Sequence, residues 1–214
     1  MFEAVTGLVL RTRPLTETSL IVHWLTPECG RLATVAKGAR RTKSPFRGKL
    51  DLFYLAKFGF SRSRTSELHQ LREVSVLETH GFLRREIGYL QQAAYCAGLI
   101  ELATETETPL GAMFELICGL LQALPQHPPQ PQLIMGFEVK LLVECGLEPD
   151  LSQTQLTGGA KAFIQNFARA DWSGISRLRL NPIQLKELRQ FLHGFLIFHL
   201  GRLPKGRETA LNAV

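Results

Sequence analysis

The stretch VLRTRPLTETSLIVHWLTPECGRLATVAKG (residues 9–38) decides the fold of the first third of the chain. Three runs rich in β-branched and aromatic residues alternate there with PLTET and PECG, which are turn sequences. Two similar runs follow at residues 51–60 and 67–78. Five short strands fit a small closed barrel of the OB type better than a sandwich, which usually needs about seven strands. Closure also removes sheet edges that would otherwise be exposed.

From residue 80 onward the pattern becomes that of helices. Between Phe82 and Ala103, apolar residues recur at three- and four-residue spacing, which predicts one apolar stripe. The members of this stripe are Leu83, Ile87, Leu90, Ala94, Ala97 and Ile100. Further helices are expected at about residues 109–124, 133–145, 158–170 and 182–200, with the Pro-rich linker PQHPPQPQ after the first of these. The expected class is α+β, with an OB-fold-like nucleic-acid-binding domain at 1–79 and an all-helical domain at 80–214.

The net positive charge of the chain belongs to the predicted barrel. Of the 214 residues, the first 80 carry 13 Lys and Arg against 7 Asp and Glu, whereas the rest carry 12 of each. Residues 31–64 hold ten basic residues and a single acidic one, Asp51. A solvated face is the ordinary interpretation of a charge run, but ordinary surfaces intersperse both signs. The excess therefore favours a surface that binds a polyanion.

The centre of this excess is KGARRTKSPFRGK (residues 37–49), which we call the basic loop. Gly38, Pro45 and Gly48 predict a flexible loop rather than a helix, and such a loop could follow a phosphate backbone. Six residues are expected to contact phosphates: Lys37, Arg40, Arg41, Lys43, Arg47 and Lys49. Flanking contacts are expected from Arg11, Arg13, Arg31, Arg62 and Arg64.

Aromatic residues in and after the basic loop could offer faces on which bases stack. For Phe53 and its neighbours on the following strand, a place in the barrel core is the favoured interpretation. Phe46 has polar and cationic neighbours, so for this residue the two interpretations stay open, and it joins the candidate DNA-binding set. No base-reading helix is evident, so weak sequence preference and strong salt dependence are expected.

No catalytic, cofactor or metal signature accompanies the charge. The chain contains no GxxxxGK[ST], GxGxxG, GxSxG or HExxH pattern. His193 and His199 are six residues apart, which does not place them on adjacent turns of one helix face. Asp51 alone cannot form the carboxylate cluster of a Mg²⁺-dependent nuclease. The sequence therefore predicts a protein that is not an enzyme and that has no cofactor.

The spacing of the cysteines and the length of the apolar stretches indicate in which cellular compartment the chain is expected. The four cysteines stand far apart without a CxxC pair, as expected of reduced, buried thiols in a cytosolic chain. The N-terminus MFEAVTGLVLRTR does not resemble a signal peptide, and apolar stretches are shorter than the ~20 residues of a membrane span.

The same residues resemble the N-terminal signature of the RecO family of recombination mediators. In that family an R-P-x-x-E-x-S turn leads to T-x-x-x-G-R and then to K-G-A-R-x-x-K-S. The matching residues here are Arg13-Pro14, Glu17, Ser19, Thr26, Gly30-Arg31, Lys37-Gly38-Ala39-Arg40 and Lys43-Ser44. The match covers about 75 residues closely, and FEVKLLVECGLEPDL (residues 137–151) is similar to a stretch of the family's helical domain.

One departure from the family concerns a zinc site. In many members the stretch ending in P-D-L is followed by C-x-x-C-G, half of a zinc site, whereas Thr154 and Thr157 stand at the corresponding positions here. Threonine cannot replace a thiolate ligand, and no second CxxC follows. We therefore expect the zinc site to be lost.

The resemblance implies a non-catalytic mediator of bacterial recombinational repair. Such proteins bind single- and double-stranded DNA, anneal strands and help load recombinase on protein-coated single-stranded DNA. Implied partners are the RecR mediator and the acidic, apolar C-terminal tail of single-strand-binding protein, and the implied location is the bacterial cytoplasm, in association with the nucleoid. Competing hypotheses are a metal-dependent nuclease, an RNA-binding barrel protein, and a scaffold whose basic loop grips an acidic tail.

Overall fold

The computed structural model describes residues 2–213, which separate into two compact units. The barrel unit holds the chain up to Gly81 together with Glu105–Glu115. The helical unit holds Phe82–Thr104 and the chain from Leu116 onward. The first break lies near the expected boundary at residue 79. The segment Glu105–Glu115, which we had expected in the helical domain, is grouped with the strands.

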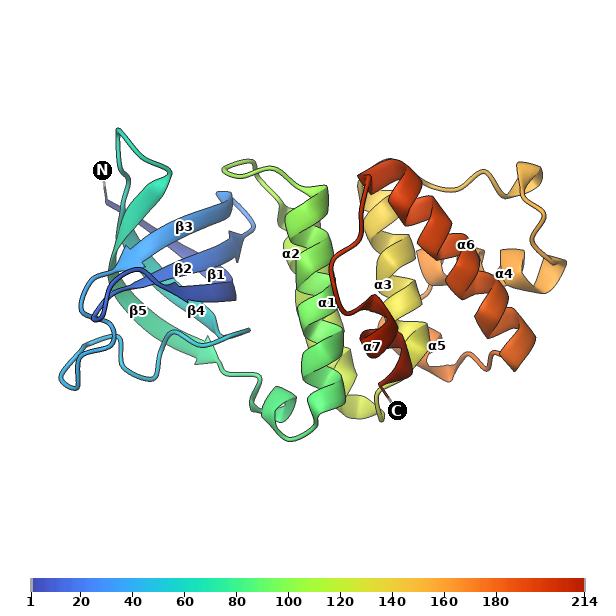
Figure 1. Ribbon diagram of the computed structural model, residues 1–214, viewed down its shortest axis with the longest axis horizontal. Coiled ribbons are helices and arrows are strands. Elements are labelled where there is room, and N and C mark those ends of the chain that lie inside the picture. Colours follow the sequence, from blue (N-terminus) through green and yellow to red (C-terminus); the bar gives the residue numbers. More distant parts are fainter. Residues whose placement is uncertain (1, 214) are drawn as a thin grey trace. The chain divides into compact units, whose positions relative to one another are not determined.

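The predicted five-stranded OB-type barrel followed by helices is confirmed (Figure 1). Neighbouring strands follow the order β1-β2-β3-β5-β4, and β1 pairs with β4 to close the barrel. Every pair is antiparallel except β3 with β5. The strands are β1 (Phe2–Pro14), β2 (Leu20–Thr26), β3 (Gly30–Ala36), β4 (Leu55–Ser61) and β5 (Leu68–Glu78).

Aromatic side chains fill the barrel core, as the alternating pattern predicts. The rings of Trp24 and Phe58 stack with 3.9 Å between their centroids, and both side chains are buried. The indole Nε1 of Trp24 donates a hydrogen bond of 2.8 Å to Oγ1 of Thr34, which satisfies its only polar atom. Phe53 is buried too, but it lies before β4, at a φ of 62°, so β4 begins later than residue 51.

Seven α-helices follow the strands within the described residues, and all belong to the helical unit except the first turns of α2, up to Glu115, which are grouped with the barrel (Figure 1). They are α1 (Ile87–Ala103), α2 (Gly111–Ala123), α3 (Pro131–Glu144), α4 (Gly158–Arg169), α5 (Trp172–Arg177), α6 (Pro182–Leu200) and α7 (Arg207–Asn212). The short helices α5 and α7 were not predicted, because six residues are too few to establish a helical period. The Pro-rich segment connects α2 to α3 within this unit and includes part of a 3-10 helix at Leu124–Gln126.

The predicted apolar stripe of α1 is wrong in part. Ile87 is 64% exposed and Ala94 is exposed, whereas Gln92, Ala93 and Cys96 are buried. The helix is buried around most of its circumference, so apolar spacing alone could not show which side faces solvent.

A buried ion pair connects α1, α3 and α7. Glu138 on α3 is fully buried and accepts hydrogen bonds from Nε (2.7 Å) and Nη2 (2.9 Å) of Arg207. The hydroxyl of Tyr95 on α1 donates to the same carboxylate over 2.6 Å, and burial together with that negative charge raises the pKa of Tyr95. Three hydrogen bonds from two residues thus compensate one buried charge, which ties α7 into the core.

No helix within residues 2–213 combines the length and the apolar character that crossing a membrane requires.

Candidate nucleic-acid interface

The basic loop lies between β3 and β4 and consists of successive turns (Figure 1). Backbone hydrogen bonds of 3.0–3.3 Å connect residues three apart, from Ala39 N to Ala36 O through Lys49 N to Phe46 O. Gly38 and Gly48 adopt φ values of 69° and 70°, a region that glycine enters without strain. The prediction of a loop rather than a helix is confirmed, and hydrogen bonds close its successive turns.

Two anchors fix the basic loop to the barrel. The backbone N of Arg40 donates to Thr18 O over 2.9 Å, and the N of Gly38 donates to Oγ of Ser19 over 3.4 Å. Phe46 is only 7% exposed and packs into the core cluster that contains Trp24. Phe46 therefore does not present a face for base stacking, and its assignment as a DNA-binding residue is corrected to a core anchor.

The six cations of the basic loop remain accessible. Lys37, Arg40, Arg41, Lys43 and Arg47 are exposed, and Lys49 is half-buried. Within residues 2–213, none of these six side chains forms an ion pair with a carboxylate. Since uncompensated cations attract a polyanion over about a Debye length, this loop is the strongest candidate contact.

Three further arginines surround one imidazole on the outer face of the barrel. Arg11 on β1 pairs in register with His23 on β2, and alternation places Arg13 and Arg31 on the same outer side. The pKa of His23 is lowered to about 4, first by burial and then by the charges of Arg11, Arg13 and Arg31. Positive potential from three strands therefore converges on this face.

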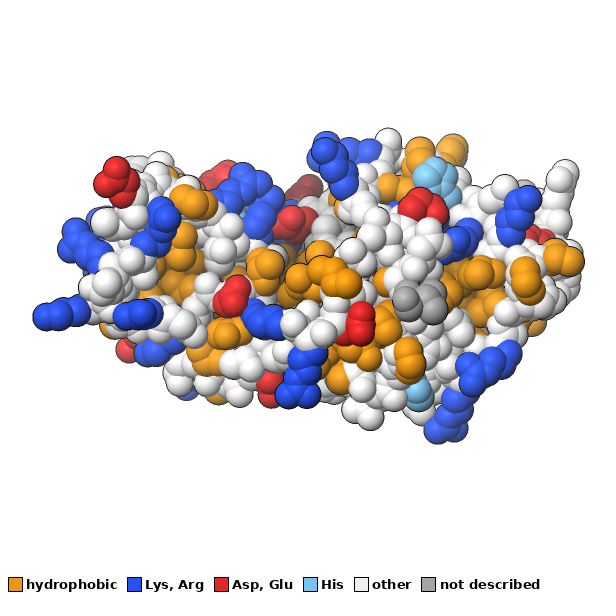
Figure 2. All heavy atoms as spheres, turned by 60° about the horizontal axis from the view of Figure 1, so that its bottom comes forward, with side chains coloured by type: hydrophobic (Ala, Val, Ile, Leu, Met, Phe, Trp, Pro, Cys, Tyr) orange, Lys and Arg blue, Asp and Glu red, His pale blue; other side chains and the backbone are white. Residues whose placement is uncertain are grey.

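The strand register joins this face to the basic loop. Pro14 pairs with Leu20, and Leu20 pairs with Ala36, so β1 ends beside the start of the loop. Arg13 lies at that end of the barrel, whereas Arg31 lies at the other end of β3. Together they extend the positive surface along the barrel wall, and Figure 2 shows several basic side chains gathered on the barrel portion.

Arg62 does not belong to this positive surface. Its Nε donates to Glu3 Oε1 over 2.9 Å, and its Nη1 donates to Glu107 Oε2 over 2.8 Å. The hydrogen bonds and negative charges of these carboxylates raise the pKa of Arg62, and Arg62 in turn lowers the pKa of Glu3. The prediction of a phosphate contact at Arg62 is therefore wrong in this conformation, whereas Arg64 is exposed and forms no ion pair with any residue in the range 2–213.

Sequence reasoning missed Glu107, because it stands 45 residues from Arg62. Its carboxylate also contacts Nε2 of His69 at 2.9 Å, and its backbone N donates to Arg31 O over 2.9 Å. A φ of 57° at Glu107 holds the side chain in this position. The segment Glu105–Glu115 thus neutralises one end of the barrel while the basic loop stays uncompensated at the other.

The residues that correspond to the family's zinc loop do not fit a metal. Thr157 donates from its backbone N and from Oγ1 to the two carboxylate oxygens of Glu187, over 2.6 and 2.8 Å. Thr154 donates from Oγ1 to Leu151 O over 3.0 Å. Residues 2–213 contain no group of three or more His, Cys, Asp or Glu placed to hold a metal ion. Hydroxyl and carboxylate groups close this loop instead.

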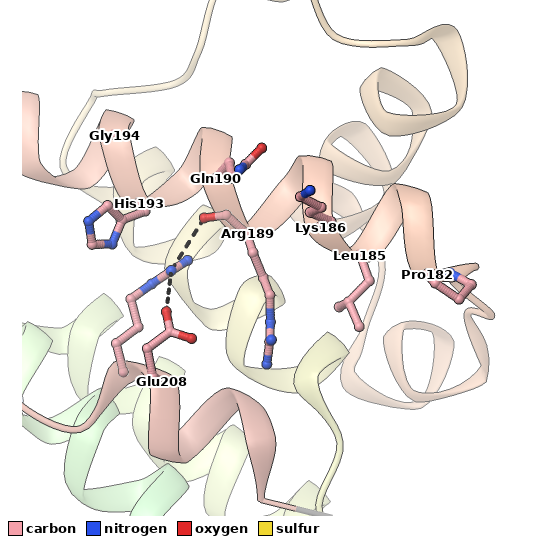
Figure 3. A pocket seen from close by; sticks show the side chains of 9 residues that line it. Pro182, Leu185, Lys186, Arg189, Gln190, His193, Gly194 and Glu208 are labelled. Carbon is pink, nitrogen blue, oxygen red and sulfur yellow. Dashed lines mark hydrogen bonds and ion pairs between the residues drawn. The ribbon is translucent and has the colours of Figure 1, made fainter.

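A second candidate site lies in the helical unit, between α6 and α7 (Figure 3). The pocket measures about 560 Å³ and combines apolar Pro182 and Leu185 with the cations Lys186 and Arg189, with His193, and with the carboxylate of Glu208. Within residues 2–213 the buried Nε of Arg189 has no hydrogen-bond partner. The pocket thus offers an apolar wall beside cationic side chains.

The chain is similar to known proteins along most of its length. The family described as recombination protein O N terminal matches residues 1–80, and recombination protein O C terminal matches residues 84–160. A protein called DNA repair protein RecO from Anaeromyxobacter sp. (strain K) is 35% identical, over 69% of this chain and 58% of the relative. The protein of the same name from Anaeromyxobacter dehalogenans (strain 2CP-C) is 34% identical, over 95% of this chain and 94% of the relative. One from Bacillus pumilus is 29% identical over 95% of this chain and 81% of the relative.

Proposed function

This chain belongs to the RecO family of DNA repair proteins, and on that premise we propose that it is a non-catalytic recombination mediator in bacteria. It binds single- and double-stranded DNA, anneals complementary strands and helps load recombinase on protein-coated single strands. The observation that supports this proposal best is the uncompensated charge of the basic loop, which lies beside Arg13 at the end of β1.

Phosphate contact explains both binding and annealing. Each cation that meets a phosphate releases condensed counterions, so affinity arises without reading a base sequence. Two strands held against one cationic surface repel each other less than free strands do, which favours their pairing. The contacts assigned to this role are Lys37, Arg40, Arg41, Lys43, Arg47 and Lys49, flanked by Arg11, Arg13, Arg31 and Arg64.

The pocket between α6 and α7 supports a second part of the proposal. Single-strand-binding protein, an expected partner, ends in an acidic, apolar tail, and the pocket pairs Leu185 with cationic Lys186 and Arg189. A tail carboxylate could pair with these cations while an apolar side chain packs on Leu185. The RecR mediator and a cytoplasmic, nucleoid-associated location follow from the family alone.

Strand annealing is the direct test. Two complementary strands, one of them fluorescent, are coated with purified single-strand-binding protein and mixed with or without this chain. We expect pairing to be faster with the chain and to slow as salt rises. No acceleration at any salt concentration would contradict the proposal.

Two further measurements separate the rivals. Release of labelled fragments with Mg²⁺ would indicate a nuclease, although Asp51 is the only acidic residue in the sequence stretch 31–64. Tighter binding of RNA than of single-stranded DNA of the same sequence would favour an RNA-binding barrel.

A further inference from the structure

A hollow of about 280 Å³ opens within the basic loop. Arg40, Arg41 and Arg47 line it. Nη1 of Arg47 donates to Thr42 O over 3.2 Å, and Nη1 of Arg40 contacts Thr16 O at 3.5 Å, so backbone carbonyls orient two of the three guanidinium groups. A Cβ built at Gly48 would meet nothing within 4 Å, which leaves that side of the hollow open.

The same hollow has an apolar floor. Leu20 and Leu50, which are half-buried and pack against the core cluster, supply its accessible apolar surface, and the buried residues Ala39 and Phe46 add only small exposed parts. A phosphate chain alone has no use for such a floor, because phosphates are satisfied by cations and backbone N–H groups at an open surface. A hollow with cations around an apolar floor matches a group that is charged at one end and flat and apolar at the other.

A nucleotide of single-stranded DNA has this combination of properties. Its phosphate can pair with the guanidinium groups, and its base can leave the stack to lie on the apolar floor. A base within an intact duplex cannot do so without the cost of unpairing and unstacking, which amounts to a few kcal/mol. The hollow lies near the lower end of the volume range of small-molecule sites.

We infer that this hollow receives one unstacked base of single-stranded DNA, between Arg40, Arg41 and Arg47 and above Leu50. The inference rests on the proposed DNA binding and adds that the loop distinguishes single strands from duplex.

An abasic strand tests the inference without altering the protein. Oligothymidylate and an abasic strand of equal length carry the same number of phosphates, and each is titrated over a range of salt concentrations. We expect equal salt slopes and about tenfold weaker binding of the abasic strand, since one stacked base contributes a factor of this order. Equal affinity of both strands at equal slopes would overturn the inference and leave the proposed DNA binding intact. Loss of salt-dependent binding for both strands would overturn the proposed function itself.

A variant that makes the floor polar locates the effect. Leu50→Gln keeps a side chain of similar size and the same charge but replaces an apolar contact with a polar group, and we expect it to reduce the difference between the two strands to less than about twofold. Leu77→Gln is the matched control, because Leu77 is 57% exposed and does not line the hollow. If folded Leu50→Gln, with its melting temperature measured, preserves the tenfold difference, the base binds elsewhere and the inference fails.

Discussion

Replacing Arg40, Arg41 and Lys43 together with alanine should weaken the salt dependence of DNA binding by a calculable amount. All three side chains are exposed, and none pairs with a carboxylate within residues 2–213. If each meets one phosphate, the slope of log K against log salt falls by about 0.9 per contact on duplex and about 0.7 on single strands. The variant should therefore lose about 2.7 from the duplex slope and about 2.1 from the single-strand slope.

Fluorescence anisotropy between ~50 and ~200 mM salt measures this change. Over that fourfold range, the duplex affinity of the unaltered chain should fall about 40-fold more than that of the variant. Stability should change by no more than about 0.5 kcal/mol, because only exposed side chains are removed.

A charge-matched control shows whether the salt slope depends on the position of these three charges or only on the net charge of the chain. Arg169, Arg177 and Arg179 are exposed residues of the helical unit, and their replacement by alanine removes the same three charges. This control should preserve the slope. If both triple variants shift the slope equally, or neither does, then the basic loop is not the site of phosphate contact.

Four other changes have defined outcomes. Arg62→Ala should leave the salt slope within error in the same titration, because two carboxylates already neutralise this side chain. Glu138→Gln should lower the free energy of unfolding in urea by about 3 kcal/mol, because within residues 2–213 the buried Arg207 would keep only the exposed Glu208, 3.7 Å away, as a charged partner. The pKa of His23 is lowered to about 4 in the folded chain, so as pH falls below about 6.5 the imidazole takes up a proton in the unfolded chain before it does so in the folded chain. The free energy of unfolding should therefore decrease as pH falls from about 6.5 toward 4. Bound phosphates should raise the pKa of His23, which an NMR titration measures. Treatment with a chelator should leave the melting temperature unchanged, whereas Glu187→Ala should lower it through loss of the hydrogen bonds that close the loop after α3.

The barrel could be predicted from sequence because its signal is local. Val22 and Trp24 alternate with Ile21 and His23 along β2, so the period of two appears in adjacent letters. The turn sequences between strands mark their ends just as directly. The strand order and the closing pair β1–β4 match what a five-strand barrel requires.

The basic loop shows what a local pattern does not reveal. Gly38, Pro45 and Gly48 predict an irregular segment, and the segment is irregular. Its attachment to the barrel, however, comes from the hydrogen bond to Thr18 and from the packing of Phe46 in the core. These partners lie on other strands, so composition cannot distinguish a mobile loop from an anchored one.

Only part of the candidate site could be predicted, because some of the residues that shape it are also distant in sequence. A cluster of cations is visible in sequence, but a distant carboxylate that neutralises one of them is not. Glu107 reaches Arg62 only because its segment returns to the barrel after α1. A groove between helices could be expected, but the residues that line the pocket were equally hidden, since Arg189 and Arg207 come from different helices.

The ion pair between Glu138 and Arg207 has a consequence for synthesis on the ribosome. All five barrel strands have been made once residue 78 is added, so the barrel can begin to assemble while translation continues. The helical unit cannot bury Glu138 favourably until Arg207, which follows it by 69 residues, has also been made. Nascent chains that stop before this arginine should present a finished barrel beside an unfinished helical partner, which chaperones and proteases would recognise.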